Sequence, residues 1–276
     1  MATIQIMING LPGNLASTLA GFAIEDGRFA LIDHSLTGPE ITETQHRIKE
    51  TTFRLIGPQT RQQEIQSIKE SAGQFTAIDF THPSAVNENA EFYCDNHIPF
   101  VMGTTGGDRD RLYKTIENSD ICAVIAPNMA KQIVGFQAMM EYAAQNFPGL
   151  FEGYFLTIEE SHQQKKADTS GTAKAMVEYF NKLGVDFKKE DIIQIRDPEE
   201  QKNRLGVPEK HLSGHGWHTY TLVSPDKTAT FRFTHNINGR KIYAEGTFDA
   251  VNFLTKKMNQ GERGRVYSMI DVLKGA

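Results

Sequence analysis

Cysteine is scarce in this chain, which has only Cys94 and Cys122 among its 276 residues. Two cysteines cannot build a disulfide framework, and so low a content fits a reducing compartment. Met1 leads within three residues into an apolar stretch, which leaves no room for a targeting peptide. From the sequence we therefore expect a cytoplasmic protein without structural disulfides.

Long apolar runs and net positive charge are missing as well. The longest apolar run covers residues 121–126 and is far too short to span a bilayer. The formal net charge is -5, so no overall positive field would hold a nucleic acid. The sequence thus predicts no membrane and no nucleic-acid partner, and any anionic ligand must be met by local positive charge.

The first half of the chain alternates strand-like and helix-like segments. Predicted strands cover residues 4–10, 28–35, 75–81, 98–106 and 121–128. Predicted helices cover residues 14–26, 65–73, 85–97 and 109–119. This alternation is typical of a doubly wound parallel sheet in an α/β protein. Residues 1–128 are therefore predicted to form a Rossmann-like, dinucleotide-binding domain.

The second half follows a different pattern. After a predicted helix at residues 137–147, apolar and polar residues alternate as in half-buried strands. These predicted strands cover residues 154–160, 191–197, 217–224, 229–237 and 240–248. Charge, proline and glycine make residues 197–216 a predicted loop excursion. We expect a second, α+β domain over residues 129–245 with a mixed or antiparallel sheet, while predicted helices 249–259 and 266–275 could pack on either domain.

A glycine-containing turn follows the first predicted strand. Gly10, Gly13 and Ala16 are spaced three residues apart, with Pro12 between the two glycines. Such a turn lets the backbone approach a pyrophosphate at the positive end of the next helix. An ordinary strand–helix turn explains the same residues about as well, but the position in the first turn of the series favours a nucleotide site.

Later turns of the same series carry further candidate residues. The second predicted strand ends at Asp33, His34 and Ser35, where an acidic residue would bind a ribose hydroxyl. Residues 102–107 and 126–131 follow two later strands, and small residues at such strand ends would let a nicotinamide ring lie close to the backbone. Solvated turns are the alternative at each place.

Three histidines, His211, His215 and His218, suggest a metal site by their spacing. They are predicted to lie in a glycine-rich loop that enters a strand, with no cysteine nearby and no metal-binding helix motif. The sequence therefore favours polar loop histidines over a metal site.

Residues 160–173, ESHQQKKADTSGTA, concentrate proton-carrying groups ahead of a predicted helix start at residues 170–172. Free backbone donors and capping hydroxyls at that helix start would bind a carboxylate. His162 and Lys166 precede it. A solvated charged loop is the alternative and is favoured by composition alone. Together with the dinucleotide features, however, this combination describes a site for reducing an anionic imine.

Neighbouring charge bears on how Lys166 would act. Lys165 and Asp168 lie alongside it in the sequence. A lysine that is partly desolvated near other cations has its pKa lowered toward values useful for proton transfer. Adjacent residues can also face opposite ways, so the pattern leaves both arrangements open.

The stretch ESHQQKKADTSGTA resembles the signature of 4-hydroxy-tetrahydrodipicolinate reductase, also called dihydrodipicolinate reductase, the nicotinamide-dependent reductase of diaminopimelate and lysine synthesis. Similar segments occur in the expected order over nearly the whole chain. They are NGLPGNLA, DFTHPSA, VMGTTGGDR, APNMAKQ, GHGWHTYTLVSPD, GRKIYAEGT and VYSMIDVL. The chain is more similar to the plant-type branch than to the common bacterial one, because Gln163 stands in place of a second histidine and DTSGT is one residue shorter.

The resemblance implies roles for individual residues. His162 resembles the family's acid/base histidine, and Lys166 resembles its proton-donating lysine. The implied substrate-binding residues are Gln163, Ser170, Gly171, Thr172 and Arg240. The implied cofactor-binding residues are Gly10, Leu11, Pro12, Gly13, Asn14, Leu15, Asp33, His34, Phe80, Gly103, Thr104, Thr105, Ala126, Pro127, Asn128 and Met129.

The resemblance also implies ligands and assembly. The implied cofactor is NADPH or NADH, the substrate is a small dicarboxylate, and no metal is implied. A homotetramer would assemble through the second domain, and residues 246–276 would return to pack on the first.

Two alternatives remain at this level. One is another two-domain dehydrogenase, acting on a sugar or a semialdehyde. A semialdehyde dehydrogenase needs a nucleophilic cysteine, and neither Cys94, in a predicted helix, nor Cys122, in a predicted buried strand, lies in an activating setting. The other is a catalytically silent dinucleotide sensor that binds a partner protein. Such a sensor would not need His162, Lys166 and Arg240 together.

Overall fold

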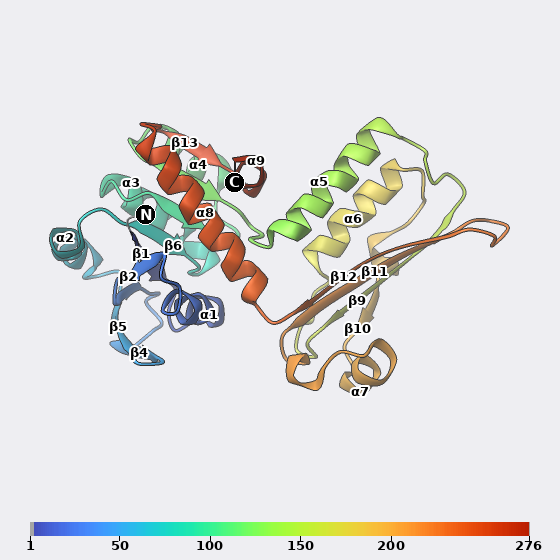
Figure 1. Cartoon of the computed structure of the whole chain (residues 1–276), viewed down its shortest axis with the longest axis horizontal. Helices are drawn as coiled ribbons and strands as arrows, with labels where there is room; N and C mark the ends of the chain where they lie inside the picture. The colour runs from blue at the N-terminus through green and yellow to red at the C-terminus, as the bar shows by residue number, and fades with distance from the viewer. Residues whose placement is uncertain (1–2, 276) are drawn as a thin grey trace. The chain divides into compact units, whose positions relative to one another are not determined.

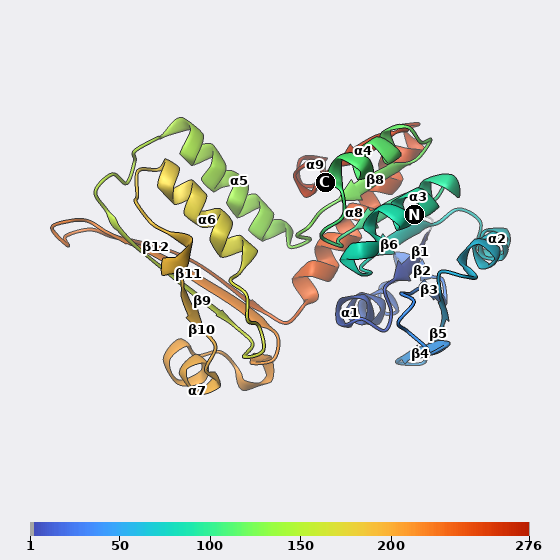
Figure 2. The ribbon, with the colours of Figure 1, turned by 180° about the vertical axis from the view of Figure 1, so that it is seen from behind.

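The computed structural model describes residues 3–275, and its contacts divide the chain into two compact units. Unit 1 comprises the described parts of residues 1–131 and 241–276, and unit 2 comprises residues 132–240. Figures 1 and 2 show both units from opposite sides. Within residues 3–275, no helix has the length and apolar character needed to cross a membrane.

Unit 1 is built on a sheet of six parallel strands in the order β13-β8-β7-β6-β1-β2. The strands are β1 (Ile4–Asn9), β2 (Phe29–Leu31), β6 (Thr76–Asp79), β7 (Phe100–Met102), β8 (Cys122–Ile125) and β13 (Arg265–Tyr267). The central strands β6, β7 and β8 are fully buried, as is usual for parallel strands covered on both faces. The predicted Rossmann-like sheet is confirmed.

Helices cover both faces of this sheet. They are α1 (Asn14–Ala23), α2 (Arg61–Ala72), α3 (Val86–Asp95), α4 (Arg109–Glu117), α8 (Lys241–Asn259) and α9 (Met269–Gly275), with a short 3-10 turn η1 (Pro83–Ala85). In Figure 1 helix α8 lies in front of the sheet, and in Figure 2 helices α3 and α4 lie in front, so these elements cover opposite faces. The sheet therefore has the layered form of a doubly wound α/β domain.

The prediction of a strand at residues 240–248 is wrong, because helix α8 begins at Lys241 and runs through this segment. Its buried residues include Ala244, Thr247 and Val251, whose spacings of three and then four positions follow a helical period and not the strand period of two. Gly246 allows the close approach of this helix to the chain after β8, since a Cβ at this position would overlap the carbonyl oxygen of Met129.

Strand β13 is a second departure near the C-terminus, because the sequence predicts a helix over residues 266–275. Arg265–Tyr267 instead pair with β8 at the edge of the sheet, and helix α9 begins only at Met269. Three residues carry little periodicity of their own, so the pairing partner decides their conformation.

The predicted strand 28–35 is divided in the structure. Strand β2 pairs with β1, but β3 (His34–Leu36) belongs to a separate sheet of three strands, β3-β5-β4. This sheet includes β4 (Gln45–Ile48) and β5 (Thr51–Ile56), which the sequence analysis did not predict. The side chain of Asn9 accepts a hydrogen bond from the amide of Leu36 at 2.8 Å, so a side chain takes the place of a strand partner where β1 ends.

A buried carboxylate organises the carboxyl end of the large sheet. Asp79, the last residue of β6, is fully buried. It accepts hydrogen bonds from the hydroxyls of Tyr93 (2.8 Å), Thr81 (2.8 Å) and Thr104 (2.7 Å) and from the amide of Asn89 (3.0 Å). Within the described range no lysine or arginine forms an ion pair with it, and hydroxyl and amide donors satisfy its buried oxygens.

Unit 2 contains a sheet of four strands in the order β10-β9-β11-β12. The strands are β9 (Phe155–His162), β10 (Ile193–Ile195), β11 (His215–Val223) and β12 (Thr230–Asn238). Strands β9 and β10 are parallel, and the other neighbouring pairs are antiparallel. Helices α5 (Lys131–Asn146) and α6 (Gly171–Lys182) pack on one face of it through an apolar cluster that includes Phe180 and Tyr220. The predicted mixed sheet is confirmed.

The predicted loop excursion 197–216 contains short helical turns. These are α7 (Pro198–Glu200), the π turn η3 (Gln201–Leu205) and the 3-10 turn η4 (Glu209–His211); a further 3-10 turn, η2 (Lys189–Asp191), precedes β10. His215, which the sequence placed in the loop, lies in β11, and His218 lies in the same strand, within the range predicted as a strand; both are buried. Their strand pairing with β9 and β12 outweighs the flexibility of the neighbouring glycines.

Stacked histidines form part of the buried face of this sheet. The rings of His218 and His235 stack with centroids 4.5 Å apart, and His235 Nε2 lies 3.3 Å from the hydroxyl of Tyr220. Burial lowers the pKa of His218 well below its ordinary value and lowers the pKa of His235 to about 4. Both rings are therefore neutral in the folded protein at pH 7.

We expect Tyr93→Phe to destabilise unit 1 by about 1–3 kcal/mol. The change removes a donor from buried Asp79 and the acceptor of a 2.9 Å hydrogen bond from Asn9. Urea unfolding followed by far-UV circular dichroism measures the loss. The matched control is Tyr113→Phe in the same unit, because Tyr113 is exposed, and it should unfold like the wild type. Equal midpoints for both variants would contradict the stabilising role of the network.

We expect unit 2 to lose stability as the pH falls from about 6.5 toward 4. Histidines in the unfolded chain gain protons in this window, whereas the pKa of folded His235 is about 4. The unfolded state then binds more protons, at a cost to stability of up to about 1.4 kcal/mol per pH unit for each such histidine. Urea midpoints at several pH values, read from the fluorescence of the single tryptophan, Trp217, measure the slope.

His235→Gln should make this slope shallower, because glutamine does not titrate. The control His211→Gln removes a histidine of the same unit that lies outside the stack and should leave the slope unchanged. A slope that His235→Gln does not alter would exclude this ring as the source of acid sensitivity.

Candidate active site

The carboxyl ends of the parallel strands gather most of the predicted cofactor residues at one edge of unit 1. Strands β1, β6, β7 and β8 are neighbours in the sheet, and Gly10, Phe80, Gly103 and Ala126 follow them directly. In open α/β sheets ligands bind at this edge, at the point where the strand order reverses. Here the reversal lies between β1 and β6.

The turn after β1 has the geometry of an anion cradle. Gly10 has φ +106°, and a Cβ there would overlap the carbonyl oxygen of Phe80. A Cβ at Gly13 would lie 2.7 Å from the carbonyl oxygen of Gly10, and Gly13 precedes the first residue of α1. Side chains are therefore excluded at these two positions, and the free backbone N–H groups at the start of α1 can point at a phosphate. These residues fit a dinucleotide.

Not every predicted residue of this turn faces the cradle. The side chain of Leu11 is fully buried, and its amide donates to the hydroxyl of Ser35 at 3.2 Å. Leu11 therefore packs into the core, whereas Asn14 is exposed and Pro12 and Leu15 are half-buried.

The predicted ribose-binding residues, Asp33 and His34, lie between β2 and the end of β3. The carboxylate of Asp33 is exposed and lies 2.9 Å from Nδ1 of His34. A hollow of about 620 Å³ lies further along the chain, and its first lining residue is Leu36, the last residue of β3. The hollow is lined by the last residues of β3 and β5 and by the segments after β3, β5 and β6. The lining residues are 36–40, Ile56, Pro58, Gln59, Arg61, Thr81, His82, Ser84, Ala85, Glu88 and Asn89. The hollow was not predicted from the sequence, because its lining depends on strand β5, which was not predicted.

Arg61 and Glu40 are the missed residues of this hollow with the most informative chemistry. The Arg61 guanidinium donates to Asn89 at 3.0 Å and lies 4.8 Å from the ring centroid of Phe92. Both residues line the hollow, Glu40 after the end of β3 and Arg61 after the end of β5. The sequence TTFRLIGP, with its alternation and its closing glycine and proline, is the signal that could have located the strand before Arg61.

The remaining predicted cofactor residues differ in their surroundings. The ring of Phe80 lies against Gly103, where a Cβ would overlap it. Thr104 is buried, and its hydroxyl donates to Asp79 at 2.7 Å, whereas Thr105 is exposed. Thr104 is therefore occupied by the buried network.

The segment after β8 also mixes buried and open residues. Ala126 and Met129 are buried, and Pro127 is exposed. Asn128 accepts a hydrogen bond from the amide of Ala130 at 2.9 Å. Backbone atoms of this segment, more than its side chains, are available to a ligand.

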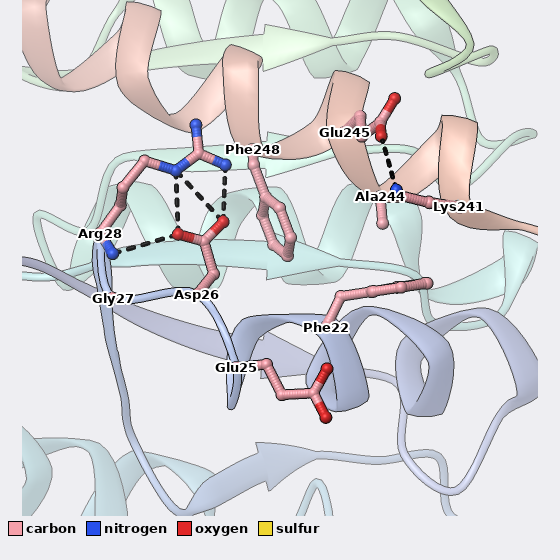
Figure 3. Close-up of a pocket in the computed structure, with 9 residues that line it drawn as sticks. All are labelled: Phe22, Glu25, Asp26, Gly27, Arg28, Lys241, Ala244, Glu245 and Phe248. Atoms are coloured by element: carbon pink, nitrogen blue, oxygen red, sulfur yellow. Dashed lines mark hydrogen bonds and ion pairs between the residues drawn. The ribbon is translucent and has the colours of Figure 1, made fainter.

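A second hollow of unit 1, of about 360 Å³, lies at the amino end of the sheet (Figure 3). Arg28 precedes β2 there and pairs with Asp26 at 2.6 Å, while Lys241 and Glu245 pair at 3.6 Å. These charges compensate one another, so the hollow offers little to an anionic cofactor.

In unit 2 the predicted catalytic and substrate residues meet at one end of the sheet. Strand β9 ends at His162, and its neighbour β11 begins at His215, while β12 ends at Asn238 opposite His215. The segment from residue 163 to the start of α6 and Arg240 both leave the sheet from this end. The sequence predicted that β9 stops at residue 160, but the strand extends to His162, which fixes that residue on the sheet.

Glu160 is the buried centre of this end, and the sequence analysis gave it no role. Its side chain is fully buried on β9. One oxygen lies 2.7 Å from His162 Nδ1, and the other lies 2.7 Å from Nη2 of Arg196. Burial alone would raise the pKa of Glu160, but the contacts with His162 and Arg196 outweigh it and lower this pKa to about 2. The carboxylate is therefore ionised at neutral pH.

Arg196 ties the loop after His162 to the sheet. Its guanidinium donates to the backbone oxygens of Glu160 (3.3 Å), Lys166 (2.8 Å) and Asp168 (3.4 Å). Gln201, which is fully buried, donates to the backbone oxygen of His162 at 2.7 Å. The excursion after β10 thus supplies supports for the candidate site, which only the three-dimensional contacts reveal.

The two adjacent lysines of the loop differ in their contacts. Lys166 is half-buried, and its Nζ lies 2.7 Å from the carboxylate of Asp168, whose pKa this contact lowers. The amide of Lys166 donates to the oxygen of Gln163 in a tight turn. Lys165 is exposed. The ammonium group of Lys166 is therefore held in an ion pair, whereas the side chain of Lys165 is open to solvent.

The start of helix α6 lies at the same end of the sheet. Ser170 is its N-cap, but its hydroxyl makes no capping hydrogen bond and instead lies 3.0 Å from Nε2 of His218. The expected capping by this hydroxyl is wrong, because the buried histidine engages it. Gly171 and Thr172 open the helix, and a Cβ at Gly171 would meet nothing within 4 Å. Their backbone N–H groups remain available to an anion.

Arg240, at the end of unit 2, carries a half-buried guanidinium. Its Nη1 lies 3.7 Å from the Cβ position of Gly214. Across residues 3–275 it forms no hydrogen bond or ion pair with a side chain or backbone group. A planar cation without an internal partner suits a ligand carboxylate.

Glu160, His162 and His218 bring ligand atoms within 4.8 Å of one another, a spacing that a metal ion could use. The guanidinium of Arg196 already contacts this carboxylate and would repel a divalent cation. The ring of His218 is engaged with Ser170. The donor set therefore fits a metal poorly.

The sequence matches the family described as "Dihydrodipicolinate reductase, N-terminus" over residues 4–129 and "Dihydrodipicolinate reductase, C-terminus" over residues 133–273. It is 47% identical to 4-hydroxy-tetrahydrodipicolinate reductase 2, chloroplastic, of Arabidopsis thaliana, covering 98% of this chain and 77% of that protein. It is 26% identical to the 4-hydroxy-tetrahydrodipicolinate reductase of Methanosphaera stadtmanae, covering 98% of this chain and 99% of that one.

A solved structure described as dipicolinate-bound dihydrodipicolinate reductase from Paenisporosarcina sp. TG-14 has the same fold. Its TM-score is 0.66 at 17% identity, over 97% of this chain and 98% of that one. The family matches cover both units, and the curated relatives of high identity are oxidoreductases. The chain belongs to the dihydrodipicolinate reductase family.

Proposed function

We propose that this chain reduces 4-hydroxy-tetrahydrodipicolinate to tetrahydrodipicolinate, with NADPH or NADH as the reductant, in the diaminopimelate route to lysine. The observation that carries the proposal is the end of the unit 2 sheet, where His162, Lys166, an open helix start and Arg240 occur in a chain of this family. The substrate is a small dicarboxylate, and this end of the sheet offers two kinds of carboxylate donor.

One carboxylate would bind the backbone N–H groups of Gly171 and Thr172 at the start of α6. The other would bind Arg240, whose fork can donate two parallel hydrogen bonds. Gln163, half-buried just after His162, would contact the substrate from the loop. Ser170 would act indirectly, since its hydroxyl is engaged with His218.

When bound, the reduced nicotinamide supplies a hydride to a conjugated cyclic imine, formed from the substrate by loss of water. Electron density then moves toward the ring nitrogen, and the enamine that results takes a proton on carbon. His162 and Lys166 would stabilise the developing charge and supply this proton. Asp168, 2.7 Å from Lys166 Nζ, would hold the ammonium in place.

Unit 1 would bind the cofactor at the carboxyl edge of its sheet. Backbone groups of residues 10–15 would hold the pyrophosphate, and residues 103–105 and 126–129 would lie beside the nicotinamide. The adenosine end would occupy the hollow of about 620 Å³ near Glu40 and Arg61. A carboxylate favours a free ribose hydroxyl and a guanidinium favours a phosphate, so this pair is compatible with both cofactors.

A homotetramer is part of this proposal, as the family resemblance implies. Support comes from the face of the unit 2 sheet that points away from α5 and α6. It carries a row of side chains that are exposed or half-buried: Thr157, Thr219, Thr221, Thr234 and Trp217. Such a face can pack against a second sheet. The expected cytoplasmic location stays a prediction, and the Arabidopsis relative is named as chloroplastic.

Cysteine chemistry gives no support to the alternative of a semialdehyde dehydrogenase. Both thiols are buried. Burial raises the pKa of Cys94 to about 11 and also raises the pKa of Cys122. Neither thiol would supply a thiolate nucleophile at neutral pH.

The direct test mixes pyruvate, aspartate semialdehyde and a dihydrodipicolinate synthase and follows the absorbance of the reduced cofactor after this protein is added. We expect oxidation of NADPH and of NADH, each measured separately. No oxidation of either cofactor, with both bound to the protein by titration, would favour the silent dinucleotide sensor.

Lys166→Ala should lower kcat by about 10²–10³-fold, as expected for loss of one positioned acid. Steady-state kinetics with saturating cofactor measure the effect. The matched control is Lys165→Ala, which removes the same charge one residue away from an exposed side chain. It should leave kcat nearly unchanged, with a modest rise in KM for the dianionic substrate. Equal, small effects of both changes would remove Lys166 from the chemistry.

Arg240→Lys should raise the substrate KM by more than about tenfold, or about 1.4 kcal/mol, because an ammonium cannot reproduce a bidentate carboxylate contact. The cofactor Kd should stay unchanged. Arg204→Lys is the control, since Arg204 lies in the same unit and pairs with Glu159 at 2.8 Å. A normal KM in Arg240→Lys would show that this guanidinium does not bind substrate.

A further inference from the structure

We propose that Glu160 is a positioning residue that holds a proton on Nδ1 of His162, so that Nε2 is the nitrogen that takes up and releases the catalytic proton. This inference rests on the proposed role of His162 in proton transfer. It adds a residue for which neither the motif nor the family match gives a role, and it specifies which ring nitrogen meets the substrate.

The contact between the two side chains sets the proton. Glu160 Oε2 lies 2.7 Å from His162 Nδ1 in a contact too bent to be a full hydrogen bond, and neither atom has another hydrogen-bond partner among the described residues. Both residues project from β9 two positions apart, onto the same face. An ionised carboxylate can only accept a hydrogen bond, so the facing nitrogen must carry the proton. The same logic orients a histidine by a buried carboxylate in other proton-transfer sites.

The opposite edge of the His162 ring, which carries Nε2, faces a position without a side chain, Gly216. His162 Nε2 lies 3.3 Å from the position that a Cβ on Gly216 would occupy. Any side chain at Gly216 would therefore cover this nitrogen. The His162 side chain is 14% exposed, so the ring is held while one edge remains accessible.

The second oxygen of Glu160 prevents the carboxylate from turning away. It accepts from Arg196 Nη2 at 2.7 Å and from the amide of Ser170 at 3.3 Å. Arg196 also holds the backbone oxygen of Lys166. One carboxylate thus links the histidine, the lysine loop and the first turn of the carboxylate-binding helix.

The other ionisable groups around His162 do not compete for this role. His218 lies 3.9 Å from the same Glu160 oxygen, but it is closer to Ser170, at 3.0 Å. Burial keeps the pKa of His218 well below its ordinary value, and it also lowers the pKa of His215 and His235. These rings face the cluster as neutral groups, and Arg196 is the one further permanent charge among the described neighbours.

The closing experiment compares wild type with Glu160→Gln in the full-length protein labelled with ¹³C and ¹⁵N in histidine. The carbon and nitrogen shifts of an imidazole distinguish its two neutral tautomers, and His162→Gln identifies the resonances of this ring. We expect Nδ1–H in the wild type and a shift toward Nε2–H in Glu160→Gln. We also expect kcat to fall about 10–100-fold, with the substrate KM and cofactor Kd within about twofold.

The matched control is Glu159→Gln, one residue earlier on the opposite face of β9. Its carboxylate pairs with Arg204 at 2.8 Å, so tautomer and kcat should match the wild type. If Glu160→Gln does not fold, Glu160→Asp keeps the charge for Arg196 but draws it back from His162, and the same tautomer shift is expected. An unchanged tautomer in the folded variant, or Nε2–H in the wild type, would overturn the proposal.

The experiment separates this inference from the proposed function. Full activity of His162→Gln would refute the role of His162 in the reaction, whatever the spectra show. A tautomer shift in Glu160→Gln would then still establish that the carboxylate orients the ring, without a catalytic consequence.

Discussion

The buried ion pair between Glu160 and Arg196 is the interaction on which the candidate active site depends. It joins β9 to β10 and holds the loop that carries Lys166, and its carboxylate also contacts His162. Removing one member of such a pair leaves an uncompensated buried charge, which typically costs about 3–5 kcal/mol. A pair this expensive to break gives the loop a defined geometry, which a flexible charged segment could not maintain.

Unit 1 also buries a carboxylate at the end of a strand, but among the described residues no lysine or arginine forms an ion pair with it. Asp79 is buried where β6 ends, and its oxygens accept hydrogen bonds from hydroxyl and amide donors such as Tyr93 and Asn89. The donors are Thr81 and residues of helix α3, which follow β6 itself, and Thr104, which follows the neighbouring strand β7. One carboxylate thus ties together the segments that follow β6 and β7. Each unit therefore places its reactive or binding groups around a buried carboxylate at a strand end.

The sequence predicted the structure correctly where the hydrophobic periodicity and a sequence motif indicated the same element. The alternation in the first half predicted the parallel sheet, and the stretch from residue 160 to residue 173 predicted a helix start beside an imidazole and an ammonium. The failures occurred where tertiary pairing outweighs local pattern. Residues 240–248 look like a strand but belong to helix α8, which packs close to the backbone of Met129 at Gly246. The small sheet with β5 was missed, and with it Arg61.

The sequence by itself determined the fold class, the family resemblance and the residue types of the site, because strand period, turn glycines and motif order are local properties of the chain. Only the tertiary structure decided which groups support them. Glu160 is one of many carboxylates in the sequence, and Arg196 and Gln201 lie more than thirty residues away from it. Their roles arise from burial and from contacts across the sheet, which set charge state and orientation, and neither is encoded in spacing along the chain.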